Sequence, residues 1–324
     1  MRSPLRKRLA FLGLLVGATG IGFAPILVRL SEVGPSATAF YRLFLALPVL
    51  WLWMGLESRD KPKKPISDSA ERTLDRNEQG NRLQNDKSRL AESTGVFALA
   101  GFFFAADLAF WHWSIRWTTV ANSTLITNFA PILVTLGARF IFLERITGAL
   151  LAGLALAILG GTLLVGASLQ ITADHVIGDF LALITAFFYA AYLLTVKYLR
   201  RWFSTPTILT YSGLVSCPLL LGVAMLSRET LISGTIRGWL VLLMLAWVSQ
   251  VGGQGLITYG MAHLTASFTA VSLLLQPVVA ALLAWLILAE KLSWMHAIGG
   301  AIILTGIAIA SRGNVSESVM PNRP

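Results

Sequence analysis

The chain has 324 residues, of which 55% are hydrophobic and only 13% are charged, and its mean hydropathy is +0.69. A soluble domain carries about 25% charged residues, so the composition excludes an ordinary water-soluble protein and predicts a membrane protein with several spans. The formal net charge of +10 raises nucleic-acid binding as an alternative. The basic residues lie in loops between apolar segments, however, which is typical of membrane proteins rather than of a basic binding face.

Ten apolar segments are long enough to cross a hydrocarbon core of ~30 Å. They cover residues 9–30, 36–56, 95–115, 119–142, 147–168, 177–197, 206–227, 238–258, 264–289 and 292–311. The first segment is too long for a signal-peptide core and lacks a clear cleavage site, so we expect it to be a retained span. The single cysteine, Cys217, lies inside an apolar segment, which excludes an intrachain disulfide and a cysteine metal site.

Two stretches of the chain match at a constant offset of 146 residues. The matched pairs are Pro131/Pro277, Glu144/Glu290, Gly153/Gly299 and Gly160/Gly306. Such a repeat indicates a duplicated fold. We therefore predict an all-α integral membrane protein with ten transmembrane helices, in which residues 9–168 form one five-helix repeat, 177–311 form the second, and 312–324 are a cytoplasmic tail. Five spans per half is an odd number, so the repeats would be inverted, as in many secondary transporters.

The distribution of Lys and Arg predicts that both termini lie on the cytoplasmic side of the plasma membrane. With this orientation, the outer side receives only Arg29, Arg116, Arg228, Arg237 and Lys291. Residues 57–93 nearly balance acids against bases and have no apolar periodicity. We expect them to form a mobile polar cytoplasmic loop, with a regulatory docking site as the alternative.

Asp107 is a carboxylate deep inside a predicted span, where an acid must face a cavity, a partner or a substrate. Arg42 in the second span is its candidate partner. If the two side chains pair, Asp107 is structural; if they do not, it can carry a proton. Trp111, four residues further on, shares the helical face of Asp107.

Polar side chains precede the two repeated prolines and recur in the sixth and eighth spans. A proline inside a helix frees a carbonyl and is tolerated where neighbours or a cavity satisfy the backbone. The polar stripes therefore predict either a central cavity or hydrogen bonds between helices. The candidate cavity residues are Asp107, Trp111, Thr127, Asn128, Tyr189, Gln250, Gln254, Tyr259 and Gln276. The candidate structural or gating residues are Arg42, Pro131, Pro277, Glu144 and Glu290.

Glu144 and Glu290 each follow a span and precede the next one closely. Both are compatible with proton coupling, but we interpret them as residues that end one helix and cap the N-terminus of the following helix.

Three stretches resemble a known family: AFYRLFLALP from residue 39, GFFFAADLAFWHWSIRWTTVANSTLITNFAPILV from residue 101 and QPVVAALLAWLILAEKL from residue 276. They are similar to the EamA-type family of the drug/metabolite transporter superfamily, over both five-helix repeats. The resemblance implies ten transmembrane helices in two inverted repeats around a central cavity. It also implies transport of amino acids, metabolites or drug-like molecules, often outward, without specifying the substrate. The long loop 57–93 departs from the compact bacterial pattern.

We therefore expect a plasma-membrane carrier that exports a small organic solute, such as an amino acid, by alternating access. A phosphorylated substrate needs cationic groups, and we expect only Arg42 and Lys197 near the cavity. Nucleotide-sugar or sugar-phosphate exchange and drug transport are the alternatives within the same superfamily. A polytopic membrane enzyme is disfavoured because the four histidines are scattered and no nucleophile motif is present. A channel fits an inverted repeat with kinked helices less well.

The expected partners are a small-molecule substrate and the lipid bilayer. We expect no nucleic acid, no cofactor and no metal, and assembly as a homodimer is left open.

Overall fold

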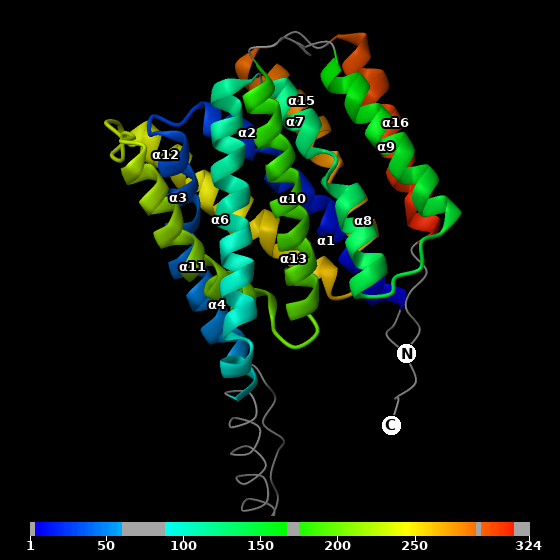
Figure 1. Ribbon diagram of the computed structural model, residues 1–324, viewed down its shortest axis with the longest axis horizontal. Coiled ribbons are helices and arrows are strands. Elements are labelled where there is room, and N and C mark those ends of the chain that lie inside the picture. Colours follow the sequence, from blue (N-terminus) through cyan, green and yellow to red (C-terminus); the bar gives the residue numbers. More distant parts are fainter. Residues whose placement is uncertain (1–3, 60–87, 119, 167–174, 290–292, 314–324) are drawn as a thin grey trace, which may run out of the picture.

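The computed structural model describes residues 4–59, 88–118, 120–166, 175–289 and 293–313, and the regular elements of these ranges are helices (Figure 1). The helices of the first half are α1 (Pro4–Gly22), α2 (Ala24–Arg29), α3 (Pro35–Phe44), α4 (Leu47–Arg59), α6 (Thr94–Trp117), α7 (Val120–Thr127), α8 (Ala130–Ile141) and α9 (Gly148–Gly166). Those of the second half are α10 (Val176–Leu199), α11 (Thr205–Leu226), α12 (Ile236–Met244), the π-helix η2 (Leu245–Gln254), α13 (Gly255–Met261), α14 (Ala266–Ser272), α15 (Leu275–Leu288) and α16 (Trp294–Arg312). Glu290, most of the predicted loop 57–93 and most of the tail 312–324 lie outside the described residues.

Within the described residues, eight helical segments are long and apolar enough to cross a membrane. They are Leu5–Arg29, Pro35–Glu57, Thr94–Trp117, Val176–Leu199, Thr205–Leu226, Ile236–Met261, Ala266–Ile287 and Trp294–Arg312. Two shorter apolar helices, Ala130–Ile141 and Gly148–Leu164, lie in the fourth and fifth predicted spans. Large apolar side chains such as Trp51, Phe140 and Phe187 are exposed on the outside of the bundle, as expected of a surface in contact with lipid. The protein is therefore an all-helical, multi-pass membrane protein.

Prolines coincide with four interruptions of the helices, one of them between α3 and α4, where Pro48 lies in the first turn of α4. The chain leaves helical geometry between α7 and α8, and Pro131 lies in the first turn of α8. It does so again between α14 and α15, where Pro277 lies in the first turn of α15. Pro25 similarly follows the interruption between α1 and α2. Each ring removes a backbone donor and clashes with the carbonyl four residues earlier, so the helix breaks just before each proline.

The repeated glycines form the contact between α9 and α16, which lie side by side at one edge of the bundle (Figure 1). A Cβ built on Gly153 would lie 2.4 Å from the carbonyl oxygen of Gly306, and one on Gly160 would lie 2.6 Å from that of Gly299. Only glycine allows the two backbones to approach so closely. The four glycines that match along the sequence are thus the residues at which these two helices touch.

The ends of α8 and α15 also correspond. Leu143 and Ala289, which are separated by the repeat offset of 146 residues, both have left-handed backbone, with φ of 55° and 53°. Non-glycine residues adopt this conformation uncommonly. The two helices therefore end with the same local geometry.

Candidate functional site

A cavity of about 490 Å³ lies at the centre of the bundle, a volume that suits a small organic molecule. Both halves of the chain contribute to its walls, the first half through α1, α2, α3, α6, α7 and α9 and the second half through α10, η2, α15 and α16. Its deep part is lined by Thr185 and Gln254, and its lining continues to Arg29, Arg116 and His296 at helix ends. These helix ends lie on the side of the bundle away from the start of α1 and the end of α16 (Figure 1). Among the described residues, the lining of the cavity thus reaches helix ends on this face of the bundle.

The structure brings seven of the nine predicted cavity residues together. These are Asp107, Trp111, Thr127, Asn128, Tyr189, Gln254 and Gln276. Gln250 and Tyr259 do not line the cavity. Gln250 is buried behind it, and Tyr259 is partly exposed with its ring against that of His263, at 5.1 Å between centroids. Gln250 and Gln254 are four residues apart in the π-helix η2, but only Gln254 lines the cavity, whereas Gln250 Oε1 accepts a hydrogen bond from Arg42 Nε.

Asp107 and Arg42 both line the cavity and are almost fully buried. The Arg42 Nε donates to Gln250 Oε1 at 3.0 Å, and its guanidinium carbon lies 5.8 Å from the centre of the Phe104 ring. The two charges are close enough to interact electrostatically, but among the described residues they form no direct ion pair. The structure thus places the two predicted partners in the same cavity but without a direct ion pair between their described side chains.

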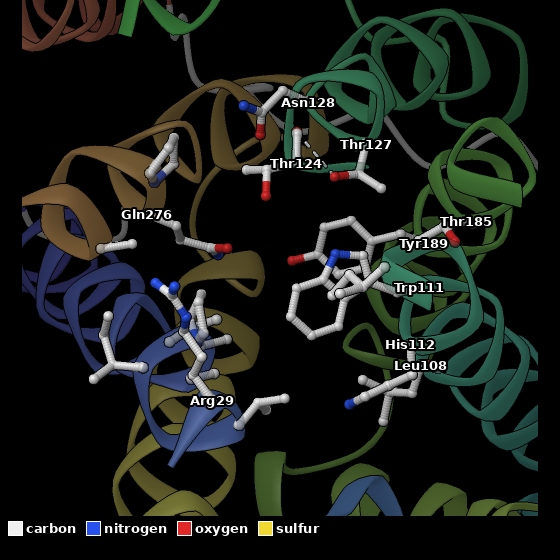
Figure 2. Close-up of a pocket in the computed structure, with 18 of the residues that line it drawn as sticks. Arg29, Leu108, Trp111, His112, Thr124, Thr127, Asn128, Thr185, Tyr189 and Gln276 are labelled. Carbon is white, nitrogen blue, oxygen red and sulfur yellow. Dashed lines mark hydrogen bonds between the residues drawn. The ribbon is translucent and has the colours of Figure 1, made fainter. Parts of the chain in front are cut away.

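Aromatic and amide side chains face one another across the cavity (Figure 2). Trp111 and Tyr189 lie opposite Gln276, and the Tyr189 hydroxyl points toward the Gln276 amide. Gln254 is held in place, because its Nε2 donates to the Tyr192 hydroxyl at 3.1 Å. Tyr192 is itself fully buried and stacks on Phe104. One wall of the cavity is therefore fixed by hydrogen bonds before any solute binds.

Thr127 uses its hydroxyl within its own helix, donating to the carbonyls of Ser123 and Thr124, both at 3.0 Å (Figure 2). Asn128, at the same end of the cavity, is different. Its Nδ2 is buried and has no partner among the described residues. Of these two predicted residues, only Asn128 has an unused hydrogen-bond donor.

Among the lining residues that sequence reasoning missed, four carry ionisable side chains: His112, Arg29, Arg116 and His296. His112 is buried with its Nδ1 2.5 Å from the Leu108 carbonyl, while its Nε2 has no partner within the described ranges. The arginines were predicted on the outer side, and their position at the ends of the first and third spans was the available signal. The lining thus carries three arginines with Arg42, more positive charge than expected.

Lys197, expected near the cavity, lies elsewhere. Its Nζ donates to the carbonyls of Met261, at 2.9 Å, and Leu264, at 2.5 Å. A cation at this position satisfies carbonyls left free at the end of a helix. The expectation about Lys197 is therefore corrected to a C-terminal cap of α13.

Glu144 joins the two halves on the face away from the cavity opening. Its carboxylate is 2% exposed and accepts hydrogen bonds from Ala266 N at 2.7 Å, Ser267 N at 3.1 Å and Ser267 Oγ at 2.7 Å. The residue therefore caps α14, 122 residues away, and not the following helix α9 as expected. The first turn of α9 is instead capped by Thr147, whose Oγ1 accepts from Leu150 N at 3.2 Å.

Two acids form a reciprocal link on the opposite face. Glu32 accepts hydrogen bonds from Thr235 N at 3.2 Å, from the Thr235 hydroxyl and from Ser233 Oγ at 2.7 Å. Glu229 accepts from Ala37 N at 3.0 Å. The hydrogen bonds from Thr235 and Ser233 lower the pKa of Glu32. Each acid thus ties the loop of its own half to the start of a helix in the other half.

The profile of the EamA-like transporter family matches residues 8–166 and 176–312. Two uncharacterized transporters of Archaeoglobus fulgidus are similar: one is 25% identical over 295 residues, covering 89% of this chain and 92% of that protein. The other is 28% identical over 199 residues, covering 61% and 70%. A probable amino-acid metabolite efflux pump of Salmonella typhimurium is 31% identical over 185 residues, covering 54% of this chain and 62% of that protein.

One solved crystal structure superimposes with a TM-score of 0.72 at 18% sequence identity, covering 96% of this chain and 98% of the other. At this identity the likeness concerns the fold alone.

Proposed function

We propose that this protein is a secondary transporter which exports a small organic solute across the plasma membrane by alternating access. The chain belongs to the EamA-like transporter family. The observation that carries the proposal is the cavity of about 490 Å³, whose walls come from both halves and whose described lining reaches helix ends on one face of the bundle. A carrier needs such a site between two parts that can move against each other. The names of the relatives indicate a transporter rather than an enzyme.

The proposed topology is ten transmembrane helices in two inverted five-helix repeats, with both termini cytoplasmic. Three correspondences at the repeat offset support it: the glycines shared between α9 and α16, the left-handed residues that end α8 and α15, and the breaks before Pro131 and Pro277. With this orientation, the cavity opens outward. Glu144 then lies at the closed cytoplasmic side.

The proposed substrate is a zwitterionic solute with an apolar part, such as an amino acid or a related metabolite. The cavity combines apolar side chains with amides, hydroxyls and aromatic rings, and Asp107 offers a carboxylate to an ammonium group. The similarity to a probable amino-acid metabolite efflux pump supports the same class.

A second candidate is exchange of sugar phosphates or nucleotide sugars. Arg29, Arg42 and Arg116 all line the cavity, and guanidinium groups bind phosphates in a bidentate manner. Arg29 and Arg116 are exposed, and ion pairs of exposed side chains contribute little. We therefore rank this candidate second.

Counterflow of radiolabelled amino acids in proteoliposomes tests the proposal. Unlabelled solute inside the liposomes is expected to accelerate entry of the labelled solute, and an imposed pH gradient shows whether protons move with it. Ala281→Trp fills the cavity and should abolish counterflow, whereas Leu99→Trp on the exposed surface should not. If no amino acid shows counterflow but a sugar phosphate does, the second candidate replaces the first.

A further inference from the structure

A small pocket adjoins the central cavity at the breaks between α7 and α8 and between α14 and α15. Its volume is about 30 Å³. Thr127, Asn128, Tyr189 and Gln276 line both the pocket and the cavity. The pocket is therefore a side chamber of the cavity, large enough for a water molecule or for an oxygen of a bound solute.

Two hydrogen-bond donors belonging to this side chamber's residues are unused. Asn128 Nδ2 and Gln276 Nε2 are both buried and have no partner within the part of the chain that the structure describes. The other two amides of this region are satisfied, since Gln254 donates to Tyr192 and Gln250 accepts from Arg42. Buried polar groups are almost always hydrogen-bonded, so two orphaned donors beside one chamber require an acceptor.

We propose that the side chamber is the subsite for the carboxylate of the transported solute, which accepts hydrogen bonds from the amides of Asn128 and Gln276 and from the hydroxyl of Tyr189. The three side chains come from both halves, and Tyr189 already points toward Gln276 (Figure 2). Substrate sites of secondary transporters typically lie where transmembrane helices are discontinuous, as α7–α8 and α14–α15 are here. The inference rests on the proposed function, whose substrate class it makes specific.

Asp107 completes the recognition of a zwitterion. Asp107 and Tyr189 line the same cavity, so the ammonium group of a solute whose carboxylate occupies the side chamber would lie near Asp107. The apolar side chain of the solute would then extend along the α15 wall, where Ala280 and Ala281 line the cavity. This order of contacts selects α-amino acids over amines that lack the carboxylate.

The arginines at the opening are the rival site for the carboxylate. Arg29 and Arg116 are exposed, whereas the amides of the side chamber are buried. Water screens exposed charges, so the arginines attract anions to the opening without discriminating strongly between bound solutes. The two sites therefore make different predictions for mutation.

The test compares ligand pairs that differ only in the carboxylate: leucine against isoamylamine, and phenylalanine against phenethylamine. Binding to the purified full-length protein is measured by calorimetry. Asn128→Asp and Gln276→Glu each replace an amide NH₂ with a negatively charged acceptor of nearly the same shape. Each variant is expected to weaken binding of the amino acid by about tenfold or more while the amine binds as well as before or better.

Gln250→Glu is the matched control. It makes the same substitution at an amide outside the cavity lining, and a carboxylate there can still accept from Arg42. The preference for amino acid over amine should change much less than in Gln276→Glu. Melting temperatures of all variants identify any that fail to fold.

Three results would overturn the proposal. The side-chamber variants could weaken amino acid and amine equally, Arg116→Gln alone could remove the preference, or the wild type could bind the amine as tightly as the amino acid in both pairs. If the same preparation still shows counterflow of any solute, the proposed transport function is retained and only the proposed carboxylate subsite is refuted.

Discussion

Replacement of Glu144 by Gln tests how the two halves are held together at the closed end of the cavity. The carboxylate is 2% exposed and receives three hydrogen bonds, two from the backbone of α14 and one from Ser267 Oγ. A glutamine has nearly the same shape but keeps only one acceptor oxygen. Its NH₂ group would face donors that the carboxylate now satisfies.

Hydrogen bonds to charged groups contribute about 1.5–3 kcal/mol each, and orphaned buried donors cost a similar amount. The two oxygens share the three bonds, so losing one oxygen removes at least one of them and leaves a donor unpaired. We expect Glu144→Gln to lower the free energy of unfolding by about 3 kcal/mol. The burial of the group means that solvent screening does not reduce this figure.

Reversible unfolding by SDS in mixed micelles measures the effect. Arg145→Gln is the control, because the adjacent side chain is exposed and surface substitutions usually stay within about 0.5 kcal/mol. If Glu144→Gln is as stable as Arg145→Gln, the carboxylate does not hold α14 and the reasoning is refuted.

Three further predictions concern helix packing, the outer loops and the cavity. Gly153→Val pushes a side chain onto α16, where a Cβ would lie 2.4 Å from a carbonyl oxygen, and should cost about 2 kcal/mol or more in SDS unfolding; Gly148→Val, with nothing within 4 Å, should cost far less. Because hydrogen bonds from Thr235 lower the pKa of Glu32 below 4.5, this acid stabilises the fold above that pH and loses the effect as the pH falls through its lowered pKa; the acid-induced drop in melting temperature should shrink in Glu32→Gln. Asp107→Asn should weaken calorimetric binding of leucine about tenfold and leave that of 4-methylpentanoate, which has no amine, unchanged.

The all-helical architecture could be predicted from the sequence because a membrane-spanning helix requires a long apolar segment. Long apolar segments can only be helices in lipid, and the all-helical class follows from them. The repeat was visible because glycines such as Gly153 and Gly160 are needed wherever two backbones touch. The fourth predicted span consists of α7 and α8, which the break before Pro131 separates.

The candidate site was harder to predict from the sequence, because it depends on contacts between distant parts of the chain. Gln250 and Gln254 were both predicted to line the cavity, but Gln250 accepts a hydrogen bond from Arg42 outside the lining, a contact between distant spans that the sequence does not show. Glu144 was assigned to the following helix because the sequence does not show that α14, 122 residues away, lies beside it. Arg116 looked like an interfacial charge, and only the packing of α6 against the cavity places it at the opening.

Alternating access of the cavity is the most direct measurement. Thr124→Cys, in a Cys217→Ser background, places one thiol on a residue that lines the cavity, and a membrane-impermeant thiol reagent is applied to right-side-out and inside-out vesicles. We predict labelling from both sides, with transported amino acid changing the two rates in opposite directions. Labelling from one side only, unchanged by any solute, would contradict a carrier that alternates around this cavity.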